Sequence, residues 1–204
     1  MKFNTPTKLT FLRLILSLCI IILLVFPFYR VGFTFKTFLF HSILIDVRYV
    51  LCGVIFILAS ITDYFDGYLA RKNKQVTDFG KFSDAIADKV LVNSVLIIFA
   101  AQGFIPAIVP VVIVVRDIIV DAIRMNVATK GVVQAAKLSG KLKTASLMVG
   151  IILTFFYNLP FELFGLQISK FFLYFGTLMS LVSMVEYYNL NKKMLYSEFE
   201  EKKK

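Results

Sequence analysis

The stretch from Asp63 to Asp88 reads DYFDGYLARKNKQVTDFGKFSDAIAD and carries two pairs of acids in an otherwise apolar chain. Asp63 and Asp66 are three residues apart, and Asp84 and Asp88 are four apart, so each pair shares one face of a helix. The residues between the pairs can form a turn that brings two helix ends together. Four converging carboxylates repel one another, and divalent cations relieve that repulsion. The stretch therefore predicts a polar metal site at the ends of two helices.

The composition of the chain is that of an integral membrane protein. It has 204 residues, of which 58% are hydrophobic, and its mean hydropathy is +0.79. We expect a single membrane-embedded domain over residues 1–190 and a charged cytoplasmic tail over residues 191–204. The net charge of +10 favours loops that face anionic lipid head groups over nucleic-acid binding. Cys19 and Cys52 lie in apolar runs without metal-ligand or disulfide spacing.

The apolar runs predict an all-α fold with six transmembrane helices, since a span needs about 20 residues. Pro6 is expected to start a short interfacial helix before the first span. The connection from Val31 to Asp46 is rich in Phe and is expected at the outer interface. The expected spans are residues 9–29, 47–70, 80–101, 107–129, 141–157 and 169–190.

The distribution of basic residues predicts the orientation of the chain. Most of its 23 Lys and Arg residues fall at the two termini and in the connections after the second and fourth helices. The other side has only four, which are Arg30, Lys36, Arg48 and Lys170. The positive-inside rule therefore puts both termini on the cytoplasmic side. The acid pairs lie at the cytoplasmic ends of the second and third helices, and we expect a multi-pass protein of the cytoplasmic membrane.

The acid stretch resembles the signature of the CDP-alcohol phosphatidyltransferase family, D-x2-D-G-x2-A-R-x8-G-x3-D-x3-D. All of its fixed positions and gaps are met, at Asp63, Asp66, Gly67, Ala70, Arg71, Gly80, Asp84 and Asp88. A shorter stretch near the amino end is also similar to the family, at Asn4, Pro6, Leu9, Thr10 and Arg13. Arg13 either faces the site or anchors the helix at the interface.

The resemblance implies an enzyme that moves a lipid-bearing phosphate from a CDP-lipid to a hydroxyl and releases CMP. It implies two divalent cations, Mg²⁺ or Mn²⁺, held by Asp63, Asp66, Asp84 and Asp88. Asp88 is also the expected general base. The CDP-binding residues that it implies are Asp63, Asp66, Gly67, Arg71 and Gly80. Family members are usually homodimers, so a homodimer is expected.

The fourth helix and the segment after it carry a second group of charges. Asp117, Asp121 and Arg124 share one stripe of the helix, and Arg116 lies beside it. Ionisable groups at membrane depth are costly and usually functional, although an internal ion-pair network that locks the helices would use the same residues. The following Lys137, Ser139, Gly140, Lys141, Lys143 and Thr144 add cations that suit a phosphorylated acceptor. For Lys130 and Lys143, positive-inside charge alone is the alternative.

This second half is similar to the phosphatidylglycerophosphate synthase branch of the family. That similarity implies CDP-diacylglycerol and glycerol 3-phosphate as substrates. It makes Arg116, Arg124, Lys137 and Lys141 the candidates for binding the acceptor phosphate. Three other acceptors remain as alternatives, namely phosphatidylglycerol, inositol phosphate and serine. A small transporter or divalent-cation channel is the alternative from another class, but such proteins tend to have repeated halves, and no repeat is visible.

Overall fold

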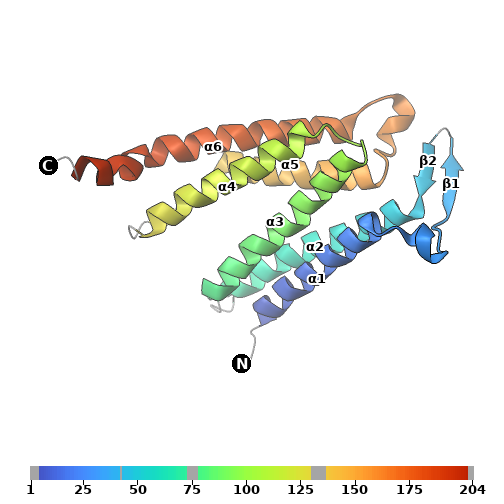
Figure 1. Ribbon diagram of the computed structural model, residues 1–204, viewed down its shortest axis with the longest axis horizontal. Helices are drawn as coiled ribbons and strands as arrows, with labels where there is room; N and C mark the ends of the chain where they lie inside the picture. The colour runs from blue at the N-terminus through green and yellow to red at the C-terminus, as the bar shows by residue number, and fades with distance from the viewer. Residues whose placement is uncertain (1–4, 42, 73–77, 130–136, 202–204) are drawn as a thin grey trace.

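The computed structural model describes residues 5–41, 43–72, 78–129 and 137–201. These residues form an elongated bundle of six α-helices (Figure 1). The helices are α1 (Thr5–Val25), α2 (Val47–Lys72), α3 (Asp78–Ala101), α4 (Ile108–Thr129), α5 (Leu138–Phe155) and α6 (Ile168–Glu201). The predicted helices therefore exist in the predicted order, with ends that differ mostly by one turn or less.

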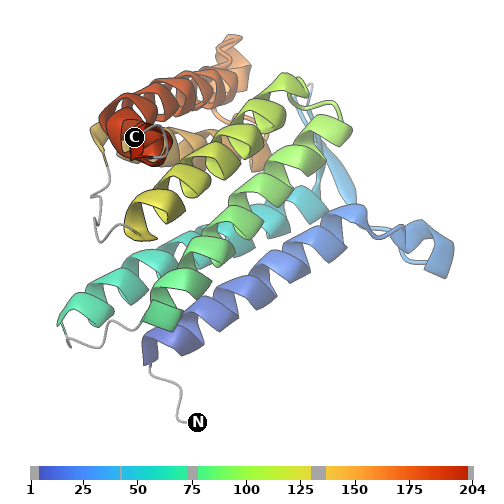
Figure 2. The same cartoon turned by 60° about the vertical axis from the view of Figure 1, so that its left-hand side comes forward.

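The bundle has two halves, with α1, α2 and α3 on one side and α4, α5 and α6 on the other (Figures 1 and 2). In the first half α1 packs against both α2 and α3, and in the second α6 packs against α4 and α5. Contacts of α3 with α4 and of α2 with α5 join the halves. Phe56, Phe99 and Phe155 are fully buried at this junction and meet edge to face or tilted.

Glycines allow α5 and α6 to approach closely. A Cβ on Gly150 would lie 2.7 Å from Leu173 Cγ, and a Cβ on Gly176 would lie 2.8 Å from Leu147 Cδ2. Small residues of this kind bring helix backbones together where the hydrophobic effect between helices is weak. The α5–α6 pair is therefore a rigid support for the charged side chains that it carries.

The connection between α1 and α2 contains structure that the all-α prediction missed. A 3₁₀ turn, η1 (Phe28–Val31), is followed by an antiparallel hairpin of β1 (Thr37–Phe40) and β2 (Ile43–Asp46). Asp46 then starts α2, because its carboxylate accepts a hydrogen bond from the backbone N–H of Arg48 at 2.8 Å. Four-residue strands are too short to give a clear alternating pattern, so the sequence did not reveal them.

The two ends of the chain also differ from the prediction. A separate interfacial helix at Pro6 was wrong, because α1 runs without a break from Thr5 to Val25. At the other end α6 continues to Glu201, well beyond residue 190. No Gly or Pro follows Asn191, and Asn191 is itself buried with its amide donating to the carbonyl of Tyr187 at 2.6 Å. Lysine, leucine and glutamate then continue the helix readily.

Two helical segments in the described part of the chain, Leu138–Phe155 and Ile168–Lys192, are long and apolar enough to cross a membrane by length and composition. Shorter apolar helical segments cover Leu9–Val25 and Val47–Thr62. Large apolar side chains also face outward from the bundle, such as Ile15 on α1 and Ile118 on α4. These features support a membrane protein, while six spans remain a prediction.

Candidate active site

The two halves of the acid signature lie on two consecutive helices, at the same end of the bundle. Asp63, Asp66, Gly67 and Arg71 belong to the last turns of α2, and Gly80, Asp84 and Asp88 belong to the first turns of α3. Figure 1 shows the end of α2 and the start of α3 at the same end of the bundle, the end where both termini lie. The side chains from Asp63 to Arg71 are outside the described part of the structure, so their mutual geometry is not assigned.

Arg13 of α1 joins the two acids of α3. Its side chain is fully buried, and its Nη1 donates to Asp84 Oδ1 at 3.0 Å and to Asp88 Oδ1 at 2.7 Å. The Asp84 and Asp88 side chains are 41% and 42% exposed, so solvent or a substrate can reach both carboxylates. Arg13 was not among the predicted site residues, although its match to the short amino-terminal stretch indicated it. The structure therefore decides between its two sequence interpretations in favour of the site.

The described part of the site fits half of the expected metal centre. Asp84 and Asp88 present carboxylate oxygens from one helix face, and hard cations such as Mg²⁺ prefer such ligands. Among the side chains that the structure describes, no group of three or more His, Cys, Asp or Glu residues could hold an ion. The side chains of Asp63 and Asp66 are not among those described, and these two acids would supply the other half of the metal centre. The donor chemistry of Asp84 and Asp88 therefore suits the expected cations.

A second charged cluster is buried between α4, α5 and α6. Asp117 receives hydrogen bonds from Arg116 Nη1 at 2.9 Å and from Lys143 Nζ. Arg116 also donates from Nη2 to Ser183 Oγ and from Nε to the carbonyl of Ser180. Arg116, Asp117 and Lys143 are each less than 10% exposed. This arrangement is the internal ion-pair network that the sequence left open as an alternative.

Lys143 and Lys89 have specific partners that their sequence positions did not indicate. Positive-inside charge alone was wrong for Lys143, because this side chain is 7% exposed and bonds to Asp117 of another helix. Lys89 follows Asp88 on α3 and pairs with Asp121 of α4. Lys130, which had the same alternative, is outside the described residues. Pairs of opposite charge therefore link α3, α4 and α5, and the hydrogen bonds of Arg116 to Ser180 and Ser183 add α6.

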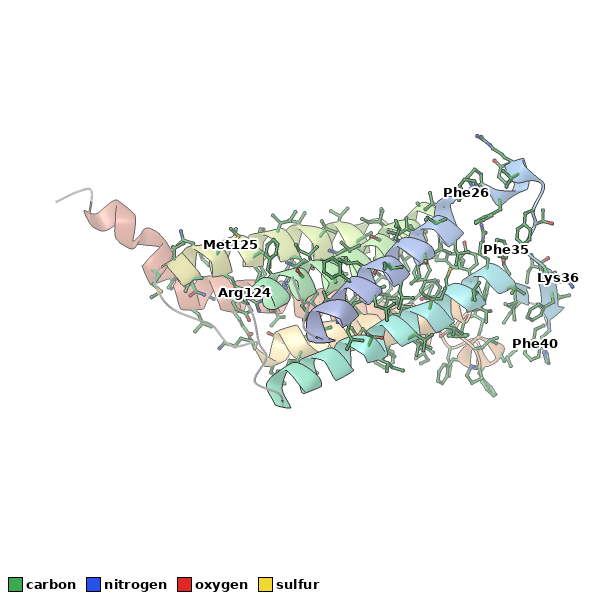
Figure 3. All side chains as sticks on the ribbon, turned by 90° about the horizontal axis from the view of Figure 1, so that it is seen from below. Phe26, Phe35, Lys36, Phe40, Arg124 and Met125 are labelled. Atoms are coloured by element: carbon green, nitrogen blue, oxygen red, sulfur yellow. The ribbon has the colours of Figure 1, made fainter. Side chains whose placement is uncertain are left out.

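The other candidate phosphate-binding residues are exposed at the same end as the acids. Arg124 donates to the Tyr187 hydroxyl at 2.6 Å, and its guanidinium carbon lies 4.7 Å from the centre of that ring. Lys137 and Lys141 are one turn apart at the start of α5, and both are exposed. Figure 3 shows Arg124 at one end of the bundle. Arg116 alone among the four candidates points into the protein.

Ser139 belongs to this end as well. It is buried, and its hydroxyl donates to Glu186 Oε2 of α6 at 2.6 Å. Glu186 was not singled out by the sequence, because a single acid on an apolar helix has no informative spacing. The bond fixes the first turn of α5 against α6, next to the two exposed lysines. The position of Lys141 therefore depends on a contact between helices as well as on its own helix.

Comparison with known proteins identifies the class. The model of the CDP-alcohol phosphatidyltransferase family matches residues 3–182, a range that contains both halves of the acid signature. The chain belongs to this family, and the resemblance drawn from the sequence is confirmed.

Three relatives are similar over nearly their whole length. The chain is 36% identical over 197 residues to a Bacillus subtilis protein, which covers 95% of this chain and 97% of that one. It is 34% identical to a Haemophilus influenzae protein (96% and 97%) and 32% identical to a Wigglesworthia glossinidia brevipalpis protein (96% and 99%). Each of the three is named CDP-diacylglycerol–glycerol-3-phosphate 3-phosphatidyltransferase.

Proposed function

We propose that this protein transfers the phosphatidyl group of CDP-diacylglycerol to sn-glycerol 3-phosphate and so forms phosphatidylglycerophosphate and CMP. The observation that carries the proposal is the near full-length similarity to relatives that bear the name of this reaction. In the reaction an acceptor hydroxyl oxygen bonds to the lipid-bearing phosphorus. The bond from that phosphorus to the CMP oxygen breaks, and the hydroxyl proton passes to a base.

The acid signature supplies the reacting centre in this proposal. Asp63, Asp66, Asp84 and Asp88 would hold two divalent cations, Mg²⁺ or Mn²⁺. Such cations, when bound, supply positive charge that stabilises the phosphoryl oxygens during in-line displacement. Asp88 takes the proton of the acceptor hydroxyl, which is consistent with its exposed side chain. Arg13 holds Asp84 and Asp88 in place from a third helix.

The CDP group binds at the junction of α2 and α3. Gly67 and Gly80 leave room for the nucleotide to approach the backbone. Asp63 and Asp66 contact the same group, and Arg71 pairs with its phosphates. The acyl chains stay in the bilayer while the head group reaches the site sideways between helices. This placement is supported by the outward-facing apolar side chains of the bundle.

The acceptor phosphate binds to the exposed cations at the same end. Arg124, Lys137 and Lys141 are accessible there, and a phosphate with two negative charges is held well by several cationic donors. Arg116 does not contact the acceptor phosphate in this proposal, because its guanidinium already donates to Asp117, Ser180 and Ser183. It therefore positions α4 against α6 below the phosphate site.

In this proposal the protein is a homodimer in the cytoplasmic membrane, and each chain spans the membrane six times. Both termini and the active site lie on the cytoplasmic side. The domain covers residues 1–190 and residues 191–204 extend it into the cytoplasm. The water-soluble substrate, glycerol 3-phosphate, then reaches the site from the cytoplasm. The direction of the helices in Figure 1 supports this topology, because both termini lie at the same end as the acid signature.

The test is CMP release by detergent-purified protein supplied with CDP-diacylglycerol and Mg²⁺ or Mn²⁺. Glycerol 3-phosphate, inositol phosphate, serine and phosphatidylglycerol are given as acceptors in parallel reactions. Release that depends on glycerol 3-phosphate supports the proposal. Release with another acceptor keeps the family chemistry and overturns the acceptor, whereas no release from folded protein with any acceptor overturns the reaction.

A further inference from the structure

The end of the bundle opposite the acid signature has an exposed apolar surface. It is formed by η1, by the β1–β2 hairpin and by a second 3₁₀ turn, η2 (Phe161–Phe164). Figure 3 shows Phe26, Phe35, Lys36 and Phe40 at this end, with Arg124 and Met125 at the other. We call this region the hairpin surface, and its most exposed apolar residues are Tyr29, Val31, Leu39, Leu44 and Phe164.

The two faces of the hairpin differ in what they contact. Directly paired residues share a face, and Phe38 pairs with Ile45 while Leu39 pairs with Leu44. Ile45 is only 5% exposed and its partner Phe38 is 49% exposed, so this face is turned toward the helices on the β2 side. Leu39 and Leu44, on the other face, are 70% and 62% exposed. A two-stranded hairpin is marginally stable in water. An apolar environment around the exposed Leu39–Leu44 pair would therefore stabilise this hairpin.

The hairpin surface also has an excess of positive charge. Arg30 and Lys36 are exposed, and the described residues offer neither of them a carboxylate partner within ion-pair distance. The acids at this end are already bonded, since Asp46 pairs with Arg48 and Glu162 accepts from the Asn158 amide. Arg30 lies over the Tyr29 ring, 6.0 Å from its centre. Aromatic rings, leucines and cations without carboxylate partners together are the composition of protein surfaces that lie at a lipid–water interface.

We propose that the hairpin surface is embedded in the lipid interface of the leaflet opposite the active site, where Arg30 and Lys36 bind anionic lipid phosphates. Leu39 and Leu44 enter the boundary between head groups and acyl chains. The surface adjoins the end of α1 and the start of α2, which carry exposed apolar side chains such as Val25 and Leu51. A second copy of the chain is a poorer occupant, because a symmetric contact would bring Arg30 and Lys36 near like charges. This inference rests on the proposed placement of the bundle across the membrane.

The chain contains no Trp, so one introduced Trp reports from one position. Leu39→Trp is made in the full chain and reconstituted into bilayers that contain brominated lipids, which quench Trp fluorescence on contact. Ile97→Trp, at a half-exposed position on α3, is the control for a lipid-facing site in the bundle. Free N-acetyltryptophanamide is the control for full exposure to aqueous acrylamide.

The expected result is strong quenching of both variants by brominated lipid and several-fold weaker acrylamide quenching of Leu39→Trp than of the free control. Quenching of Ile97→Trp but not of Leu39→Trp overturns the hairpin proposal and keeps the membrane placement. If neither variant is quenched, the membrane placement fails as well. Protection of Leu39→Trp that disappears when the protein is diluted with lipid assigns the surface to a second copy, and so overturns the lipid proposal.

The charge part is tested by changing the lipid composition. Quenching of Leu39→Trp by brominated lipid is expected to increase when phosphatidylglycerol replaces part of the phosphatidylcholine. Adding Arg30→Gln and Lys36→Gln is expected to remove that increase. The matched control is Lys192→Gln, an exposed lysine at the other end of the bundle, which is expected to leave the increase unchanged. An increase that survives loss of both cations overturns the anionic-lipid assignment.

Discussion

Arg13 and Arg116 are both buried arginines that bond to aspartate, but their partners differ in exposure. Arg13 reaches Asp84 and Asp88, whose side chains are more than 40% exposed. Arg116 reaches Asp117, whose side chain is 10% exposed and is shared with Lys143. The first cluster keeps carboxylate surface available for a ligand. The second is enclosed in the protein, where Arg116 and Lys143 share the one carboxylate of Asp117, so its main effect is to hold α4, α5 and α6 together.

The comparison shows why the types of charged residue do not by themselves identify a site. A buried ion pair is costly to break because one charge is left without a partner, even when the intact pair adds little net stability. Asp84 and Asp88 bond Arg13 but keep carboxylate surface exposed to solvent, where a cation can bind without breaking a buried pair. Substitutions in the acid signature should therefore affect catalysis, and substitutions in the α4–α6 cluster should affect folding.

The largest effect is expected from Asp84→Asn. The amide removes a negative charge from the expected cation site, so CMP release should fall by about a hundredfold or more, as for loss of a main electrostatic group. The buried Arg13 keeps Asp88 as a charged partner, so the melting temperature should fall less than in Asp117→Asn. CMP release and the melting temperature in detergent are measured together. The control is Asp46→Asn at the other end of the bundle, where Asn still caps a helix. Full, metal-dependent activity of Asp84→Asn would remove Asp84 from the site.

Asp117→Asn should give the reverse pattern. It leaves Arg116 and Lys143 buried without their carboxylate, which is expected to cost about 3 kcal/mol or more of folding free energy. The melting temperature in detergent should drop clearly. Asp121→Asn is the control, because its partner Lys89 is partly exposed and such pairs contribute about 1 kcal/mol or less. Equal melting temperatures for the two variants would contradict the difference in burial as the cause.

Arg13→Lys tests whether Arg13 positions the acids. Lysine keeps the charge, but its single nitrogen does not have the geometry of a guanidinium, so Asp84 and Asp88 should be held less well. We expect about a tenfold loss of activity by analogy with groups that orient metal ligands, together with a higher Mg²⁺ concentration for half-maximal rate. A purely structural role would lower the melting temperature and leave the Mg²⁺ dependence unchanged.

The smallest effect is expected from Lys141→Gln. Removing one exposed cation from a group of several should raise the KM for glycerol 3-phosphate by a few-fold and leave the KM for CDP-diacylglycerol unchanged. Initial rates with each substrate varied in turn measure both constants. Lys192→Gln is the charge-matched control. A parallel rise in both constants would indicate a general loss of positive charge near the membrane and would argue against a phosphate contact.

Much of the fold could be predicted from the sequence because long apolar runs are local signals. The six helices were found in order, and α2, α3 and α4 begin or end within two residues of prediction. The β1–β2 hairpin was missed because each strand has only four residues. The end of α6 was missed because helix formers follow the apolar run, and hydropathy alone does not separate a polar helix from a tail.

The candidate site was predicted in part for the same reason. The acid signature is a pattern of spacing along two helices, and spacing is visible in one sequence. The partners of Arg116 and Lys143 could not be predicted from the sequence, since Ser183 is 67 residues from Arg116 and Asp117 is 26 residues from Lys143. Nothing local distinguishes a lysine that faces solvent from one that reaches a carboxylate on another helix.

The sequence by itself determined the family, the apolar class of the protein and the positions of the acid pairs, because these depend on residue type and spacing along single helices. Only the tertiary structure decided which charges are accessible and which are paired inside the bundle. Arg13 reaches acids 71 and 75 residues away, and that contact exists because α1 packs against α3. Which side chains are buried, and which residues they contact, depends on how the helices pack, and that packing involves residues far apart in the chain.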